Sequence, residues 1–142
     1  LAKKLKGEEG NVYCIMSDGE MNEGTTWESA MFAAHHKLDN LVVIVDKNQW
    51  QAMGKTEEVL NLNPKLAFEG FNWHSLNLDG HNFNEIEAIF TTLNKLSKPL
   101  AVVFNTIKGK GVSFMENHLL FHYKHVDKED YEKAILELER DN

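Results

Sequence analysis

Two short segments of the chain combine oxygen-bearing side chains with turn residues at the ends of apolar runs. Asp18 and Gly19 follow the run Val12 to Met16. Asn48 follows the run Leu41 to Val45, thirty residues after Asp18. A carboxylate, an amide oxygen and a backbone carbonyl suit Mg²⁺, which takes oxygen ligands in octahedral geometry and completes its shell with water and ligand phosphates. The two motifs therefore predict a metal site that a phosphate-bearing ligand completes.

The surroundings of Asp18 are acidic, since Glu20, Glu23 and Glu28 follow it closely. Such a loop repels a diphosphate unless a divalent cation lies between them. Gly19 permits close approach of the backbone to a diphosphate, and we assign Glu20 to the same cofactor-binding loop. The sequence thus predicts a metal-bridged diphosphate ligand. Each motif alone is also an ordinary strand-ending turn, so an α/β domain without a ligand here stays open as the alternative.

Four apolar runs position these residues, and each has the length and composition of a strand. They are Val12 to Met16, Leu41 to Val45, Trp73 to Leu78 and Leu100 to Phe104. The first two are uninterrupted and predict buried strands. Cys14 lies inside the first run and is predicted to be a small core residue.

Helical patterns separate the runs. Thr25 and Glu28 have the spacing of a capping box at the start of a helix. Its apolar stripe comprises Trp27, Ala30, Met31 and Ala34. Asn82 and Glu85 repeat the capping-box spacing before a helix predicted over Asn84 to Leu96.

Less regular segments complete the chain. Residues 49–71 predict loop with short helices at Glu57 to Leu60 and Pro64 to Phe68, and Asp127 opens a last helix. Strands that alternate with helices predict an α/β fold with a mainly parallel sheet and helices on both faces. Ligands of such sheets bind at the carboxyl ends of the strands. The segments that follow the four strands are therefore expected to share one edge; they are Ser17 to Gly24, Asp46 to Gly54, Asp79 to Asn82 and Thr106 to Gly111.

The composition excludes several classes of protein. The chain has 142 residues, a formal charge of −7 and 42% hydrophobic residues, which fits a single domain over residues 1–142. No apolar run approaches the length of a membrane span, and the acidic balance disfavours nucleic acid. The single cysteine cannot form an internal disulfide, so we expect a cytoplasmic protein.

At the level of whole motifs, the sequence resembles the transketolase family. The stretch SDGEMNEGTTWESAMFAAHHKLDNLVVIVDKNQWQAMG is similar to its thiamin diphosphate motif, although Ser17 replaces the first glycine of the usual Gly-Asp-Gly. The stretch KGKGVSFMEN is similar to split transketolases whose amino-terminal half is a separate subunit. The resemblance spans Leu1 to Leu138 and implies the thiamin diphosphate-binding fold, here expected to be incomplete at its N-terminus, with thiamin diphosphate and Mg²⁺ as cofactors.

The resemblance also implies roles for individual residues near the cofactor. Asp18 and Asn48 would be the side-chain ligands of Mg²⁺, and Trp50 would supply its carbonyl oxygen. Gly19 would donate its amide to the diphosphate. Glu23 matches a catalytic relay glutamate near the subunit interface.

Two further matches are less direct. Glu28 matches a second interface glutamate, although a capping role fits it equally well. His122 falls where the family has a histidine that contacts the substrate, but Tyr123 follows it in place of the usual glycine. Lys108 and Lys110 could neutralise a sugar phosphate or be solvated, and His81 lies in a predicted strand-to-helix turn.

The function implied is transfer of a two-carbon ketol unit between sugar phosphates. A pyrimidine-binding domain or subunit would complete the active site in a homodimer or heterotetramer, and the chain alone is expected to be inactive. The sheet is expected to lack a strand, which leaves an exposed edge and apolar surface. The alternatives are a non-catalytic or regulatory cofactor-binding module and a thiamin-dependent carboligase with a different acceptor.

Overall fold

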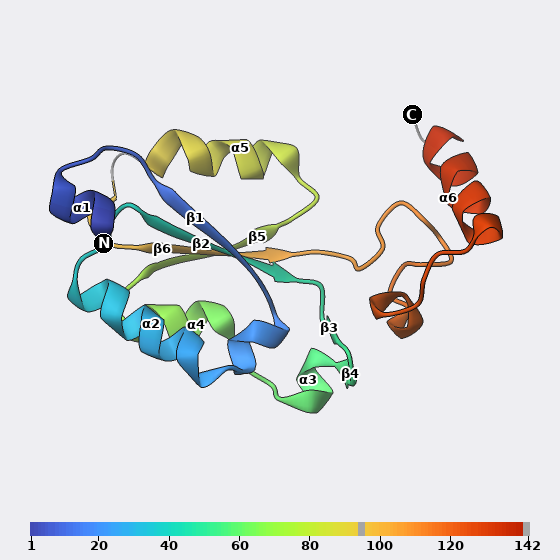
Figure 1. The fold of residues 1–142 in the computed structure, drawn as a ribbon, viewed down its shortest axis with the longest axis horizontal. Coiled ribbons are helices and arrows are strands. Elements are labelled where there is room, and N and C mark those ends of the chain that lie inside the picture. The colour runs from blue at the N-terminus through green and yellow to red at the C-terminus, as the bar shows by residue number, and fades with distance from the viewer. Residues whose placement is uncertain (94–95, 141–142) are drawn as a thin grey trace.

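The centre of the molecule is a four-stranded parallel sheet, seen in a computed structural model that describes residues 1–93 and 96–140 (Figure 1). In spatial order the strands are β1 (Val12–Ser17), β2 (Leu41–Lys47), β6 (Leu100–Asn105) and β5 (His74–Asp79). All three neighbouring pairs run parallel. The four predicted strands are thus confirmed, each with its bounds shifted by at most two residues.

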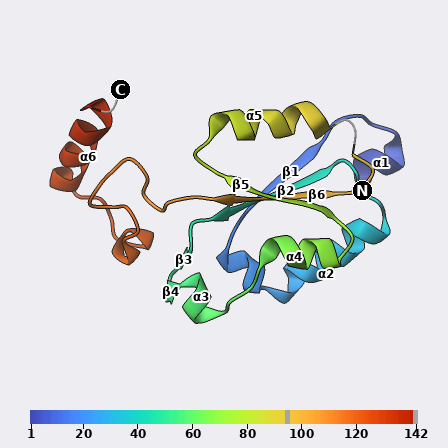
Figure 2. The ribbon, with the colours of Figure 1, turned by 180° about the vertical axis from the view of Figure 1, so that it is seen from behind.

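Helices cover both faces of the sheet, as predicted. Helices α2 (Gly24–His35) and α4 (Pro64–Gly70) lie on one face, and α5 (Phe83–Thr92) lies on the other (Figures 1 and 2). Residues 94–95 of the helix predicted over Asn84 to Leu96 lie outside the described residues. The remaining elements are short or peripheral: α1 (Ala2–Lys6), η1 (Gly19–Asn22), β3 (Trp50–Gln51), β4 (Gly54–Lys55), α3 (Thr56–Val59), η3 (Leu119–His122) and α6 (Lys128–Arg140).

Alternating side chains of the central strands build two hydrophobic clusters. Towards α2 and α4, Val45 and Val103 pack with Phe68 and Trp73, and the Trp73 indole N–H donates to the carbonyl of Ala30 at 2.9 Å. Towards α5, the strands contribute a second set, which comprises Val42, Leu100, Val102 and Phe104. Strand β6 is buried from Leu100 to Phe104 because it has a strand on each side and helices on both faces.

Strand β1 corrects one prediction from sequence. It is an edge strand whose side chains are mostly exposed, with Ile15 74% accessible. Cys14 is likewise exposed and is not a core residue. The prediction of a buried first strand, with Cys14 in the core, was wrong because β2 lies on one side of β1 and no described strand lies on the other. The predicted exposed edge with apolar surface is confirmed.

The start of α2 corrects a second prediction. The helix begins at Gly24 with the extended residue Glu23 at its N-cap, and no side chain caps it. Thr25 therefore lies inside the first turn, and the Thr25–Glu28 capping box is wrong. Of the predicted stripe, Ala30 is buried, Trp27 and Ala34 are half-buried and Met31 is exposed, whereas the unpredicted Ala33 is buried.

The second capping box is confirmed at its N-cap residue Asn82, whereas the backbone N–H of Asn82 donates to the carbonyl of Asp79 and not to Glu85. The Asn82 side chain accepts the backbone N–H groups of Asn84 and Glu85, and its amide donates to the Glu85 carboxylate at 3.0 Å. Helix α6 begins one residue after Asp127, whose carboxylate accepts the N–H of Asp130. Residues after β6 leave the sheet and carry η3 and α6 away from it (Figures 1 and 2). None of the described helices is both long and apolar enough to cross a membrane.

Candidate functional site

The carboxyl ends of the four parallel strands meet at one edge of the sheet, as predicted. Ser17 pairs with Asp46, Lys47 pairs with Asn105, and Asp79 pairs with Asn105 from the other side. We call this edge the carboxyl rim. It brings together the residues that follow β1, β2, β5 and β6. The hydroxyl of Thr106, for example, donates to the Asp46 carboxylate across sixty residues of sequence.

Asp18 is the buried acid of the carboxyl rim, with 2% of its surface exposed. Its Oδ2 atom accepts two hydrogen bonds, from the backbone N–H of Gln49 at 2.7 Å and from the hydroxyl of Thr56 at 2.9 Å. Its Oδ1 atom is buried and has no hydrogen-bond partner among the described residues. A buried carboxylate oxygen without a partner carries a large desolvation cost, and a bound cation would remove that cost.

Burial raises the pKa of the Asp18 carboxyl, and the nearby Asp46 carboxylate raises it further. The hydrogen bonds from Thr56 and Gln49, and the nearby backbone N–H of Gly19, lower the same pKa but do not overcome burial. The charged form of Asp18 is therefore incompletely stabilised by the protein alone. A divalent cation at Oδ1 would supply the missing stabilisation.

The loop after β2 carries Asn48 and Trp50 to Asp18. Gln49 adopts a left-handed conformation with φ of 69°, which is uncommon for a residue other than glycine, and its N–H points at Asp18. Asn48 Oδ1 accepts the N–H of Trp50 at 3.0 Å, and its amide approaches the Asp46 carboxylate at 3.5 Å. The three predicted metal-ligating residues are therefore neighbours through Gln49.

Gly19 and Glu20 lie on the other side of Asp18, in η1. A Cβ atom on Gly19 would meet the Gln51 side chain at an ordinary 3.5 Å, so hairpin β3–β4 closes over this glycine. The Glu20 carboxylate turns back to accept the N–H of Ser17 at 2.8 Å and its hydroxyl at 3.2 Å. Ser17 ends strand β1 in extended backbone, which any residue adopts, so serine is accommodated there as predicted.

The arrangement offers a buried carboxylate with one free oxygen, an amide and a backbone carbonyl beside a glycine at the ends of parallel strands. In a comparison with models of known protein families, the model described as "Transketolase, thiamine diphosphate binding domain" matches residues 5–138. The chain belongs to the transketolase family. The resemblance inferred from its motifs is thereby confirmed.

Comparison with individual transketolases shows what share of each relative's length this chain covers. It is 38% identical over 99% of its length to the 6-deoxy-6-sulfo-D-fructose transketolase subunit SqwG of Clostridium sp. (strain MSTE9) and 36% identical over 97% to one of the subunits of the apulose-4-phosphate transketolase of Phocaeicola vulgatus. The chain spans about half the length of these two curated relatives, 52% and 50% respectively. The transketolase of Campylobacter jejuni superposes with a TM-score of 0.87 and 29% identity, covering 93% of this chain and 21% of that enzyme.

In this transketolase domain Glu23 is exposed at the N-cap of α2. Its side chain makes no hydrogen bond or ion pair with the described residues, and Glu28 is exposed one turn later. A cavity of about 310 Å³ separates β1 from α2, and its wall includes Glu20, Glu23, Cys14 and Trp73. The structure thus shows no direct contact between Glu23 and Asp18; Glu23 is exposed and forms part of the wall of a mostly apolar hollow.

His122 ends the short helix η3 of the transketolase domain and is exposed. Helix η3 contacts β3, the strand that begins with Trp50, so His122 lies on the hairpin side of the carboxyl rim. Tyr123 follows it and is 61% exposed. The predicted placement at the mouth of a substrate channel stays a prediction.

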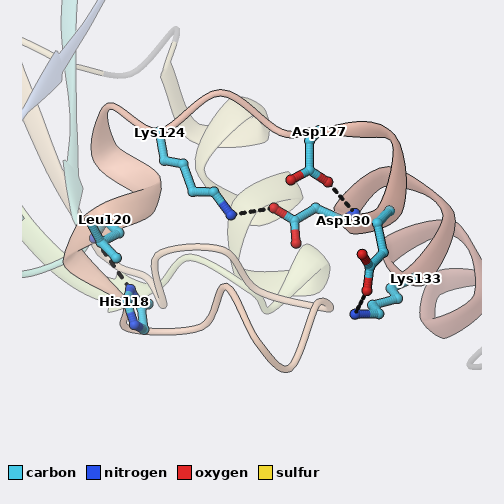
Figure 3. Close-up of polar contacts among 7 residues, drawn as sticks. His118, Leu120, Lys124, Asp127, Asp130 and Lys133 are labelled. Atoms are coloured by element: carbon cyan, nitrogen blue, oxygen red, sulfur yellow. Dashed lines mark hydrogen bonds and ion pairs between the residues drawn. The ribbon is translucent and has the colours of Figure 1, made fainter.

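Charged contacts fix the path from η3 into α6 (Figure 3). Lys124 donates to the Asp130 carboxylate at 2.5 Å and lies over the ring of Phe121, 5.2 Å from its centre. The bond to Asp130 raises the pKa of Lys124, and the N–H of Asp130 lowers the pKa of Asp127. The segment that follows His122 therefore has a defined course.

Three of the remaining polar residues considered from sequence, His81, Lys108 and Lys110, lie in or against the glycine loop after β6. His81 lies in the turn between β5 and α5, as predicted, and its Nε2 accepts the N–H of Ile107 at 2.8 Å. Lys110 pairs with Glu116 at 3.5 Å, whereas Lys108 forms no ion pair with a described residue. His35 and His36 lie exposed at the end of α2, as predicted for surface residues.

Sequence reasoning missed two residues that contact Asp18. Thr56 lies 38 residues from Asp18 and Gln49 lies 31 residues from it. Nothing in the local pattern marks either residue, because a threonine at a helix start and a glutamine in a turn are both common. Within residues 1–93 and 96–140, no group of three or more His, Cys, Asp and Glu side chains could hold a metal, so a cation site here depends on amide and backbone oxygens.

Proposed function

We propose that this chain is the diphosphate- and Mg²⁺-binding part of a transketolase-type enzyme that transfers a two-carbon ketol unit between sugar phosphates. The observation that carries the proposal is the buried Oδ1 of Asp18, which has no hydrogen-bond partner among the described residues. The loop of Asn48, Gln49 and Trp50 adjoins this carboxylate through the bond from Gln49 to Oδ2. An oxygen-rich, partly formed site of this kind suits Mg²⁺, which shares its shell with ligand phosphates.

Each residue of the rim would then have one task. Asp18 Oδ1, the side-chain oxygen of Asn48 and the carbonyl of Trp50 would hold the cation, while the amide of Gly19 would bind the diphosphate, with Glu20 bracing the loop through Ser17. The family description supports thiamin diphosphate as the ligand. When bound, that cofactor supplies a nucleophilic carbon and an electron sink for cleavage of the bond beside a ketone.

Binding by this chain would orient the diphosphate end of the cofactor and leave its ring to a partner. Two relatives are named as subunits, and each is about twice as long as the match. The exposed β1 edge, with Tyr13 and Ile15, and the exposed Met31 and Phe32 of α2 form apolar surface that a partner would cover. We infer a pyrimidine-binding domain or subunit in a homodimer or heterotetramer.

Two further residues have proposed roles in turnover. Glu23, which is exposed beside the hollow between β1 and α2, would link to the partner's acid across the interface. His122 would contact the substrate. Lys108 would attract its anionic group, because Lys110 is already paired with Glu116.

The relatives' names support a sugar that carries a strong anion. One is named for a sulfo-sugar and one for a sugar phosphate, and both anions suit lysine. We retain sugar phosphates as the proposed substrates and the cytoplasm as the proposed compartment, the latter from the single cysteine.

The experiment that tests this function is calorimetric binding of thiamin diphosphate, with and without Mg²⁺, to the chain alone and mixed with a candidate pyrimidine-binding partner. Metal-dependent binding that tightens with the partner supports the proposal. Binding without turnover in any mixture would favour a non-catalytic module, and turnover with an acceptor other than an aldose phosphate would favour a different carboligase. No binding in the mixture would contradict the proposal.

A further inference from the structure

We propose that Thr56 is a positioning residue for the cation site: its hydroxyl fixes the Asp18 carboxylate so that Oδ1 alone faces the metal. This inference rests on the proposed function, since it presupposes that Asp18 holds the Mg²⁺ that binds thiamin diphosphate. It starts from the unequal treatment of the two oxygens of one buried carboxylate. Oδ2 accepts two hydrogen bonds, whereas Oδ1 accepts none from the part of the chain that the structure describes.

A carboxylate held at a single oxygen by one donor can still rotate about its last torsion, because that torsion is broad. Two donors from different directions restrict it. Gln49 donates from the backbone and Thr56 donates from a side chain at the start of α3. The backbone donor belongs to the loop itself, so Thr56 is the side-chain component of this restraint.

Thr56 also closes the loop that carries the other proposed ligands. Its backbone N–H donates to the carbonyl of Gln49 at 2.9 Å, directly after the hairpin of β3 and β4. One residue therefore joins the far end of the hairpin to its beginning and to Asp18. The carbonyl of Trp50 and the carboxylate of Asp18 are held in one frame by these two bonds.

A rigid frame matters more for Mg²⁺ than for larger cations. Mg²⁺ requires nearly ideal octahedral geometry with short bonds, whereas Ca²⁺ tolerates variable geometry and ligand number. A loosened carboxylate should therefore impair binding of thiamin diphosphate more when Mg²⁺ is the cation than when Ca²⁺ is. A general loss of structure would impair binding with both cations alike, which separates positioning from mere folding.

The experiment measures the dissociation constant of thiamin diphosphate by calorimetry with MgCl₂ and with CaCl₂, on the full protein together with any polypeptide that completes it. Thr56→Val removes the hydroxyl and keeps the shape. We expect about 10-fold weaker binding with Mg²⁺, the lower end of effects seen for residues that orient metal ligands, and a smaller change with Ca²⁺. Thr56→Ser keeps the hydroxyl and should restore the wild-type values.

The matched control is Thr91→Val, which removes a threonine hydroxyl that bonds to the carbonyl of Ala88 on the exposed side of α5. It should leave both dissociation constants unchanged. If Thr56→Val does not fold, Thr56→Ala removes the same donor and takes its place.

The outcomes separate this inference from the proposed function. Absence of binding by the wild type overturns both. Binding that is lost in Asp18→Ala but unchanged in Thr56→Val overturns the positioning role alone. Equal losses with the two cations, or a loss that Thr56→Ser does not restore, would also overturn it, because the threonine would then support folding or packing only.

Discussion

The backbone N–H of Gln49 donates to Oδ2 of Asp18 at 2.7 Å, across 31 residues of sequence. The bond joins the loop after β2 to the loop after β1, and it uses the left-handed conformation of Gln49 to aim the donor. Strained backbone of this kind persists where the surrounding structure holds it and clusters at functional sites. The pairing directs Oδ2 to the protein, whereas Oδ1 has no hydrogen-bond partner within residues 1–93 and 96–140.

Replacement of Asp18 by asparagine should have opposite effects on stability and on binding. Asp18→Asn removes a charge that burial disfavours, so the metal-free protein should gain on the order of 1 kcal/mol of unfolding free energy, the usual size of a single substitution. Cofactor binding with Mg²⁺ should weaken more than about 10-fold. Urea denaturation in EDTA and calorimetry measure the two effects.

The control for that substitution is Asp39→Asn on the surface, where Asp39 pairs with Lys4 at 2.8 Å. Its effect on stability should stay within about 1 kcal/mol, and binding should not change. A destabilised Asp18→Asn protein that still binds the cofactor normally would contradict the assignment of Asp18.

The raised pKa of Asp18 should also appear in the pH dependence of stability. Because the folded protein holds this proton more tightly than the unfolded chain does, the contribution of Asp18 to stability falls as pH rises. The fall should span the range from the ordinary carboxyl pKa, about 4, up to the raised value. Denaturation across that range in EDTA should show this fall in unfolding free energy for the wild type and not for Asp18→Asn. Identical pH profiles of stability for the two proteins would refute the raised pKa of Asp18.

Glu23→Gln should separate cofactor binding from turnover. The side chain is exposed and makes no polar contact with the described residues, so folding and the dissociation constant of thiamin diphosphate should change little. Turnover in the presence of a pyrimidine-binding partner should fall by about 10-fold or more, as expected for loss of a proton-relay group. Glu87→Gln, at an exposed position of α5, is the control and should leave turnover unchanged. Equal turnover in Glu23→Gln and wild type would remove the relay role.

Gly80 tests the docking of the β5–α5 turn on β6. A Cβ atom there would clash with the Thr106 methyl group and lie only 3.0 Å from Phe104 Cβ. Gly80→Ala should therefore destabilise the protein by about 1 to 3 kcal/mol. Gly70→Ala, at the end of α4 with no atom in the way, should be neutral or stabilise by up to about 1 kcal/mol. Thermal unfolding compares the midpoint temperatures of the two variants. Similar midpoints would contradict the close packing of Gly80 against Thr106 and Phe104.

The predictions that succeeded depend on local chemistry or on general rules of parallel sheets. The Asn82 side chain caps α5 because Asn82 has extended backbone next to the first turn. The same spacing at Thr25 and Glu28 failed because the extended residue is Glu23, one position before the helix begins. Spacing alone does not determine which residue adopts that conformation.

The prediction for Cys14 failed for a different reason. An apolar run signals that a strand suits burial, but it does not say which segment covers it. In this structure β1 is an edge strand, so its apolar residues are exposed. The contacts of Thr56 and Gln49 with Asp18 could not be predicted from the sequence for a related reason. They depend on how the loop after β2 folds back over long sequence separations.

The position of β6 has a consequence for synthesis on the ribosome. This strand is late in the sequence but central in the sheet, between β2 and β5. Until residues 100–105 leave the exit tunnel, β5 has no described strand to pair with, and of the three described strand pairs only β1–β2 can form. The Asp18 loop is therefore translated long before the sheet that supports it can close, and a nascent chain exposes these acidic residues and apolar strands to chaperones for the time needed to make about eighty further residues.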